Sequence, residues 1–91
     1  MYQVEIKNSF KKDIKLCRKR GIDKNLINTA INTLIEKGKL PLKYKPHKLT
    51  GNYVHHWEAH LKPDLLLLWL QNDITQTIIL VRIGTQADLF N

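Results

Sequence analysis

The sequence predicts an α+β fold: an N-terminal strand and a two-helix hairpin packed on a mostly antiparallel four-stranded sheet, followed by a short C-terminal helix. Residues 2–6 alternate apolar and polar side chains, residues 10–35 carry apolar side chains at helical spacing, and residues 53–83 return to strand patterns. Short turns separate the later strands, so these strands are expected to be antiparallel neighbours. A chain of 91 residues is predicted to form a single domain, residues 1–91.

The first strand and the first helix are expected within residues 2–21. Asn8 or Ser9 is predicted to cap the helix, because both side chains accept hydrogen bonds from exposed backbone amides. Gly21 is predicted to end it, since glycine tolerates the left-handed conformation found at helix ends. One helix face is apolar and is expected to enter the core; it carries Phe10, Ile14 and Cys17.

The second helix is expected to begin after Asp23, a suitable cap, and to end at Gly38. Its apolar face is wide and consists of Leu26, Ile27, Ala30, Ile31, Leu34 and Ile35. Because the two helices are separated by only a short connection, they are predicted to form a hairpin that lies on the sheet.

Residues 39–51 are predicted to be a basic loop, and a strand is predicted from residue 52 onward. In a strand, neighbouring side chains point to opposite faces. One face is therefore expected to carry Tyr53, His55, Trp57, Ala59 and Leu61, and the other Val54, His56, Glu58 and His60.

The remaining elements follow in quick succession. Residues 65–70 form an uninterrupted apolar run, which is typical of a central strand covered on both faces. Residues 72–73 suit a turn, and residues 77–83 suit a further strand. Thr85 and Asp88 have the spacing of a capping box, which predicts a short terminal helix.

The charge of the chain is high and unevenly distributed. The formal net charge is +7, and residues 1–48 carry thirteen basic and four acidic side chains, against two basic and four acidic ones thereafter. Such a charge points to a polyanionic partner, either nucleic acid or an acidic protein.

Other classes of protein are disfavoured. Cys17 is the only cysteine, so no internal disulfide is expected, which suits a reducing cytoplasm. The N-terminus lacks the pattern of a signal peptide. The longest apolar run, residues 65–70, is far too short for a membrane span, so no membrane association is expected.

Candidate chemistry is concentrated after residue 47. His56, Glu58 and His60 share one strand face, Asp64 starts the central strand, and Arg82 interrupts an otherwise apolar strand. Strand alternation places Arg82 on the same face as Ile78 and Leu80, and a charged side chain there needs a partner or contact with solvent. One open sheet face with imidazoles, a carboxylate and a guanidinium would supply the base, acid and cation that metal-free RNA cleavage requires.

Plainer interpretations remain open at this stage. Isolated histidines on strands are commonly surface residues, an aspartate beside a proline is commonly a turn residue, and helix lysines are commonly solvated. A zinc site at His55, His56 and His60 is disfavoured, because residues 55 and 56 should point to opposite faces and no cysteine supports them.

A set of short motifs gives the chain a family resemblance. The sequence contains H-x-L-x-G from His47, A-H-x-x-P-D around His60, R-x-G-T from Arg82, and a final L-F at residues 89–90. Together these motifs resemble the YafQ branch of the RelE/ParE toxin superfamily, the mRNA interferases of bacterial type II toxin–antitoxin systems. The resemblance covers nearly the whole chain and implies a RelE-like fold.

The resemblance implies a ribosome-dependent endoribonuclease that cleaves translated mRNA with no metal or other cofactor and leaves a cyclic phosphate. Its partners would be mRNA and ribosomal RNA on the 70S ribosome, and a small, acidic, DNA-binding antitoxin in the resting complex. Catalytic positions would be His47, His60, Asp64, Arg82, Gln86 and Phe90. RNA would be bound by Lys11, Lys12, Lys15, Arg18, Lys19, Lys43, Lys45 and Lys48.

Gln86 departs from the pattern, because the family often carries a histidine there as the general acid. A glutamine side chain has no proton to give near neutral pH. Either His60 or His47 takes that role, or the chain is a weak or inactive module that still binds RNA and antitoxin. A gyrase poison of the ParE type shares the fold but requires no acid–base set.

Overall fold

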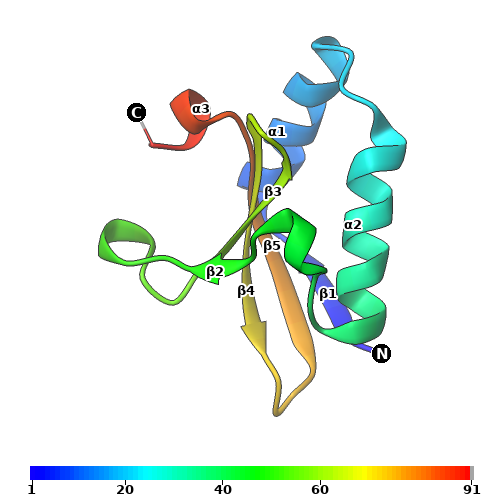
Figure 1. Cartoon of the computed structure of the whole chain (residues 1–91), viewed down its shortest axis with the longest axis vertical. Helices are drawn as coiled ribbons and strands as arrows, with labels where there is room; N and C mark the ends of the chain where they lie inside the picture. The colour runs from blue at the N-terminus through cyan, green and yellow to red at the C-terminus, as the bar shows by residue number, and fades with distance from the viewer. Residues whose placement is uncertain (91) are drawn as a thin grey trace.

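The computed structural model describes residues 1–90, and its elements confirm the α+β class (Figure 1). The helices are α1 (Asn8–Lys19), α2 (Lys24–Lys37) and α3 (Gln86–Phe90). The strands are β1 (Gln3–Ile6), β2 (His47–Lys48), β3 (Trp57–Lys62), β4 (Leu65–Asn72) and β5 (Thr77–Gly84). Two short 3-10 turns, η1 (Leu42–Tyr44) and η2 (Gly51–Tyr53), lie between α2 and β3.

The sheet has five strands rather than four, in the order β1-β5-β4-β3-β2. The three late strands are antiparallel neighbours, as predicted, and β1 pairs in parallel with β5. The additional strand is β2, whose two residues pair with Glu58 and Trp57 of β3. A two-residue strand carries no periodic pattern, which is why the sequence predicts a loop for this segment.

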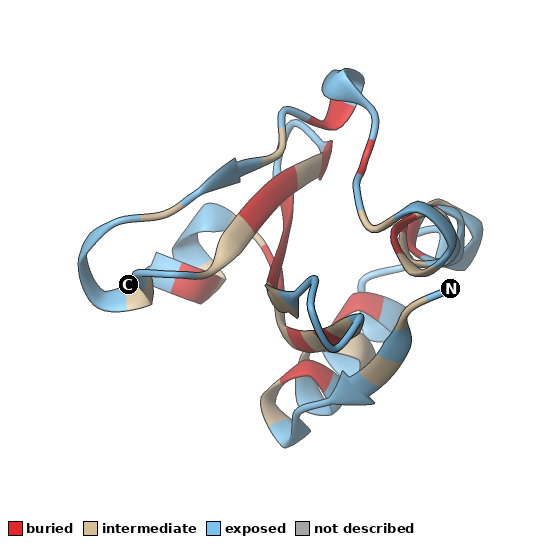
Figure 2. Ribbon diagram, turned by 90° about the horizontal axis from the view of Figure 1, so that it is seen from below, coloured by how far each residue is buried: buried red, intermediate tan, exposed pale blue. Residues whose placement is uncertain are grey.

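Helices α1 and α2 cover one face of the sheet, and α3 lies across the opposite side (Figure 1). Strand β4 separates two clusters: Leu65, Leu67 and Trp69 pack beneath the helices, whereas Leu66 and Leu68 pack against Leu89 of α3. The predicted central strand is therefore buried on both faces, as Figure 2 shows along the middle of the sheet.

The cap predicted for the first helix is wrong. Lys7 occupies the cap position of α1, with no side-chain hydrogen bond to the helix. The hydroxyl of Ser9 instead donates to the carbonyl oxygen of Val81 at 2.6 Å. A contact between α1 and β5 thus replaces a local cap, whereas the predicted stripe of Phe10, Ile14 and Cys17 does face the core.

Both ends of α2 agree with the prediction. The carboxylate of Asp23 accepts a hydrogen bond from the amide of Asn25, and Gly38 ends the helix with a φ of 68°. Glycine is required there twice over, because φ is positive and a Cβ at this position would collide with the ring of Tyr2.

Strand β3 starts at Trp57, five residues later than the predicted start at residue 52. Residues 51–53 form the turn η2, and His55 has a φ of 72°, which is incompatible with a strand. The predicted alternation holds within β3, where Ala59 and Leu61 face the helices. It fails before β3, because Tyr53 packs on the opposite side, against Leu66, Leu68 and Leu89.

No helix among residues 1–90 has the length and apolar character needed to cross a membrane.

Candidate active site

The sheet face opposite α1 and α2, called here the open face, brings most of the predicted catalytic residues together. Strand register places His47, Glu58, Leu68 and Arg82 in one row across β2, β3, β4 and β5. His60 lies one step further along β3 on the same face, opposite Leu66. Since neighbouring strands are about 4.8 Å apart, the row spans roughly 15 Å, a suitable width for a polynucleotide backbone.

A carboxylate joins the two histidines of this face. The Oε1 atom of Glu58 lies 3.1 Å from Nε2 of His47 and 3.8 Å from Nε2 of His60. Glu58 is only 7% exposed, and among residues 1–90 it is the only charged residue that is buried. The two imidazole rings stack with centroids 6.3 Å apart, so one buried charge holds both rings side by side.

Both ring nitrogens of His47 make contacts. Its Nδ1 lies 2.9 Å from the carbonyl oxygen of Lys45, which can only accept a hydrogen bond. Its other nitrogen faces the carboxylate of Glu58. Both ring nitrogens of His47 thus face oxygen atoms, which places the ring between the backbone of the loop and the buried carboxylate.

The sequence predicts the correct face for Glu58 but no role. The available signal was the alternation His56, Glu58, His60 along one strand, which puts a carboxylate between two imidazoles. His56 does not join the cluster, because its ring packs edge-on against Tyr53, with centroids 5.3 Å apart.

Arg82 reaches the open face through a β-bulge. Leu80 opposes Trp69 and Arg82 opposes Leu68, so Val81 is the additional residue of β5. The alternation of the sequence assigned Arg82 to the side of Ile78 and Leu80, which is wrong. The bulge shifts the register by one residue and turns Arg82 away from the helix-covered core.

Helix α1 fixes the bulge from the side. Strand β1 pairs with β5 only as far as Leu80, so α1 runs beside the next residues of β5. The carboxylate of Asp13 accepts from Nε of Arg82 at 2.7 Å, from Nη2 of Arg82 at 3.1 Å, and from the amide of Ile83 at 3.0 Å. The bond to Asp13 is the main reason why the pKa of Arg82 is raised. Asp13, which the sequence did not mark as a site residue, orients this guanidinium.

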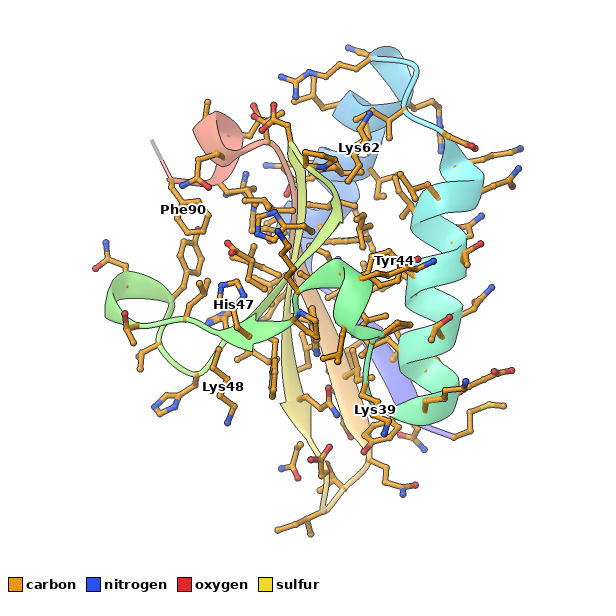
Figure 3. All side chains as sticks on the ribbon, in the orientation of Figure 1. Lys39, Tyr44, His47, Lys48, Lys62 and Phe90 are labelled. Carbon is orange, nitrogen blue, oxygen red and sulfur yellow. The ribbon has the colours of Figure 1, made fainter. Side chains whose placement is uncertain are left out.

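The C-terminal helix forms the rim of the open face. The rings of Phe90 and Tyr53 pack edge to face with centroids 5.5 Å apart, and Leu89 enters the small apolar cluster. A cavity of about 580 Å³ lies here, lined by these three residues with Thr50 and Asn52. In Figure 3, Phe90 and His47 lie on the same side of the sheet.

The predicted capping box is confirmed. The amide of Asp88 donates to the hydroxyl of Thr85 at 3.1 Å, and the amide of Thr85 donates to the carboxylate of Asp88 at 2.9 Å. Asp88 also pairs with Arg20 at 2.6 Å, which ties α3 to the end of α1. Arg20 is the main reason why the pKa of Asp88 lies well below its ordinary value.

Asp64 and Gln86 stand apart from the cluster. Asp64 is exposed in the turn between β3 and β4, and Gln86 is exposed at the start of α3. Within residues 1–90, no hydrogen bond or ion pair joins either side chain to His47, His60 or Arg82. Their catalytic roles remain predictions.

The predicted RNA-binding residues are exposed and fall into two groups. One group lies between α2 and β3 and consists of Lys43, Lys45 and Lys48. It borders the histidine cluster, because Lys45 and Lys48 lie within two residues of His47 in the sequence. Lys48 sits over the ring of Trp57, with Nζ 5.6 Å from the centroid. The other group lies on α1 and consists of Lys11, Lys12, Lys15, Arg18 and Lys19.

Comparisons with known proteins agree on one family. Residues 2–91 match the model of "Bacterial toxin of type II toxin-antitoxin system, YafQ". The mRNA interferase toxin YafQ of Escherichia coli K12 is 34% identical over 88 residues, which cover 96% of this chain and 94% of that protein. A crystal structure of an E. coli YafQ mutant with histidine replaced by glutamine has a TM-score of 0.92 at 34% identity, over 100% of both chains. YafQ in the E. coli DinJ–YafQ complex has a TM-score of 0.90 at 33% identity, again over 100% of both chains.

Proposed function

Since the chain belongs to the YafQ family of bacterial type II toxins, we propose that it is an mRNA interferase that cleaves mRNA on the translating ribosome in the cytoplasm. The observation that carries the proposal is the convergence of His47, Glu58 and His60 on a sheet face that also presents Arg82. These groups supply the acid–base pair and the cation that cleavage of a phosphodiester requires.

The proposed reaction divides the work between the two histidines. His60 takes the proton from the 2′-hydroxyl of the RNA, and the 2′-oxygen attacks the adjacent phosphorus. Arg82 stabilises the additional negative charge of the pentacoordinate phosphorus. His47, whose Nε2 faces Glu58, gives a proton to the departing 5′-oxygen as the P–O bond breaks. The products are a 2′,3′-cyclic phosphate and a free 5′-hydroxyl.

The surroundings of the cluster suit an RNA substrate. Phe90 and Tyr53 offer aromatic rings beside the row, and base stacking on such rings is worth about 1–3 kcal/mol per base. The exposed lysines of α1 and of residues 43–48 would contact phosphates of mRNA and ribosomal RNA. Asp64 is proposed to contribute a further polar contact once RNA is bound.

A cognate antitoxin is the second proposed partner. The structural relative from E. coli is found in a DinJ–YafQ complex, which is a toxin–antitoxin complex. An acidic antitoxin that covers the open face would neutralise the lysines of residues 43–48 and block access of RNA to His47 and His60.

Expression in a bacterial host tests the enzymatic function. Wild-type protein is expected to arrest growth and to produce cut sites in translated mRNA, mapped by primer extension. His60→Ala and Arg82→Ala should relieve the arrest, whereas His55→Ala, on the loop outside the cluster, should not. Absence of arrest and of cut sites with the wild-type protein would refute the proposal.

Gln86 supports a second candidate function, a weak or inactive module that binds antitoxin and RNA. Its exposed side-chain amide stands where the family often has a histidine that donates a proton, and an amide cannot replace that donor. If the second candidate is correct, wild-type protein is inactive and Gln86→His restores cleavage. If His47 is the acid, Gln86→His changes the rate of an already active enzyme only slightly.

A further inference from the structure

A basic pocket lies at the outer edge of β3, on the far side of His60 from Glu58. Its volume is about 460 Å³, and we call it the lysine pocket. Lys43, Lys45 and Lys62 line it, together with His60, Tyr44 and Leu61. Figure 3 labels Tyr44 on η1 and Lys62 near the β3–β4 turn, two of the residues that line the pocket.

The short length of β2 creates this pocket. Strand β2 pairs only with Trp57 and Glu58, so the outer edge of β3 beyond Glu58 has no strand partner among residues 1–90. The turn η1 packs there instead, and its Tyr44 is buried as part of the pocket floor. An open sheet edge leaves backbone polar groups facing outward, a common element of anion sites.

The charge of the pocket is not neutralised within the described part of the chain. Three lysines line it and no carboxylate does. The four ion pairs formed among residues 1–90 use Arg20, Arg82, His47 and His60, and none of them uses these lysines. Lys43 is held in place by the ring of Tyr44, with Nζ 5.1 Å from its centroid. Ammonium groups gathered around a concave surface attract an anion.

His60 connects this pocket to the cluster on the open face. Its ring lines the pocket, while its Nε2 faces Glu58 at 3.8 Å. Lys45 provides a second connection, because its side chain lines the pocket and its carbonyl binds His47. The backbone of an RNA strand cleaved at His60 would therefore lie next to the pocket that the three lysines line.

We propose that the lysine pocket binds a backbone phosphate of the RNA next to the cleaved linkage. The inference rests on the proposed function and specifies how the substrate is held there. An acidic protein segment would also be attracted by the lysines, but the shared wall at His60 favours the phosphate of the RNA being cleaved.

Binding of a short single-stranded RNA with 2′-methoxy groups, which cannot be cleaved by this chemistry, tests the proposal by fluorescence anisotropy. The site variant is Lys43→Gln/Lys45→Gln/Lys62→Gln. The control variant, Lys24→Gln/Lys37→Gln/Lys39→Gln, removes the same charge from exposed positions of α2 and its end. The site variant should bind about tenfold more weakly, and its salt dependence should fall by about 0.7 in log–log slope for each phosphate that it no longer neutralises.

The control should bind no more than about threefold more weakly, because it removes only long-range attraction that salt screens. Replacing the same pocket lysines with arginine should preserve binding, since the charge is kept. Lys62→Gln alone, at the exposed last residue of β3, provides a variant that leaves the core untouched. Equal effects in the site and control variants would overturn the proposal, as would a site variant that weakens antitoxin binding and leaves RNA binding unchanged.

The cleavage assay separates this proposal from the proposed function. If wild-type protein cleaves mRNA and the site variant cleaves equally well at limiting protein concentration, the pocket proposal fails and the function stands. If wild-type protein does not cleave, the function fails, and the binding of the methylated RNA still decides the role of the pocket.

Discussion

The two faces of the sheet use the same strands for different purposes. The helix-covered face has a large, continuous apolar core, built from residues that follow regular alternation. The open face has a cluster of only three buried apolar residues within residues 1–90, beside a buried glutamate, two histidines and an arginine. Regular periodicity thus produces stability, whereas the candidate chemistry depends on two local departures from it, a bulge at Val81 and the two-residue strand β2.

The sharpest test of this comparison uses adjacent residues of β4. Leu67 and Leu68 are both fully buried, but Leu67 faces the helices and Leu68 lies between Glu58 and Arg82 in the row. Leu67→Ala should cost about 3–5 kcal/mol of stability, and Leu68→Ala about 2–3 kcal/mol, because the smaller cluster can collapse more easily. Urea denaturation gives both values. Cleavage per folded molecule should fall only for Leu68→Ala; equal reductions in activity would contradict the division between faces.

The next largest effect is expected from Asp13, which links the helical layer to the open face. Asp13→Asn removes the charge that orients Arg82 and should lower the cleavage rate about 10–100-fold, with a decrease of about 1–3 kcal/mol in stability. In an Arg82→Ala background the same change should have no further effect on cleavage, because the two residues act as one unit.

Ser9→Ala is the matched control for Asp13. It removes the hydrogen bond from α1 to Val81 at the bulge without touching the guanidinium. It should reduce stability by about 1 kcal/mol and leave the cleavage rate of folded protein nearly unchanged. If Ser9→Ala reduces cleavage as strongly as Asp13→Asn does, Asp13 acts on the fold rather than on Arg82.

A smaller effect is expected at Glu58. Glu58→Gln keeps the shape of the side chain but removes the charge that holds both imidazoles. The cleavage rate should fall about tenfold, because a neutral amide orients the two imidazoles more weakly than a carboxylate does. Glu36→Gln, exposed on α2, is the control and should have no effect. Single-turnover cleavage measures the change, and an unchanged rate for Glu58→Gln would remove Glu58 from the site.

The smallest predicted effect concerns acid stability at the end of α3. The pKa of Asp88 is lowered from its ordinary value of 3.8, first by Arg20 and then by Thr85. A lowered pKa in the folded state stabilises the protein above the ordinary value, and the stabilisation is lost as the pH falls through the folded pKa. The Tm of Asp88→Asn should therefore be lower than wild type at pH 7, and the difference should shrink below about pH 4. A difference that stays constant from pH 7 to about pH 2 would contradict this link.

Much of the helix-covered face could be predicted from the sequence. Helical spacing identified the core side chains of α1 and α2, and the uninterrupted apolar run identified β4 as the doubly covered strand. Asp23, Gly38 and the Thr85–Asp88 box marked element ends correctly, because capping depends on nearby residues alone. The parallel pairing of β1 with β5 has no such local signal, since the two strands lie more than seventy residues apart.

The candidate site was less predictable, for physical reasons that differ from residue to residue. His60 and Glu58 were placed on the correct face, because β3 alternates regularly from Trp57. Arg82 was assigned to the wrong face, since nothing in the apolar run 78–83 marks Val81 as an additional residue. Asp13 acts through contacts made only in the folded chain, so its link to Arg82 leaves no pattern in the sequence.

The pairing of β1 with β5 has a consequence for the order in which the protein matures. Synthesis produces β1 more than seventy residues before its strand partner, residues 77–80. A nascent chain that has emerged only as far as residue 76 therefore has an incomplete sheet, no Arg82 beside Asp13 and no α3 beside the open face. Strand β1 and helix α1 thus wait for β5 before the sheet can close around them.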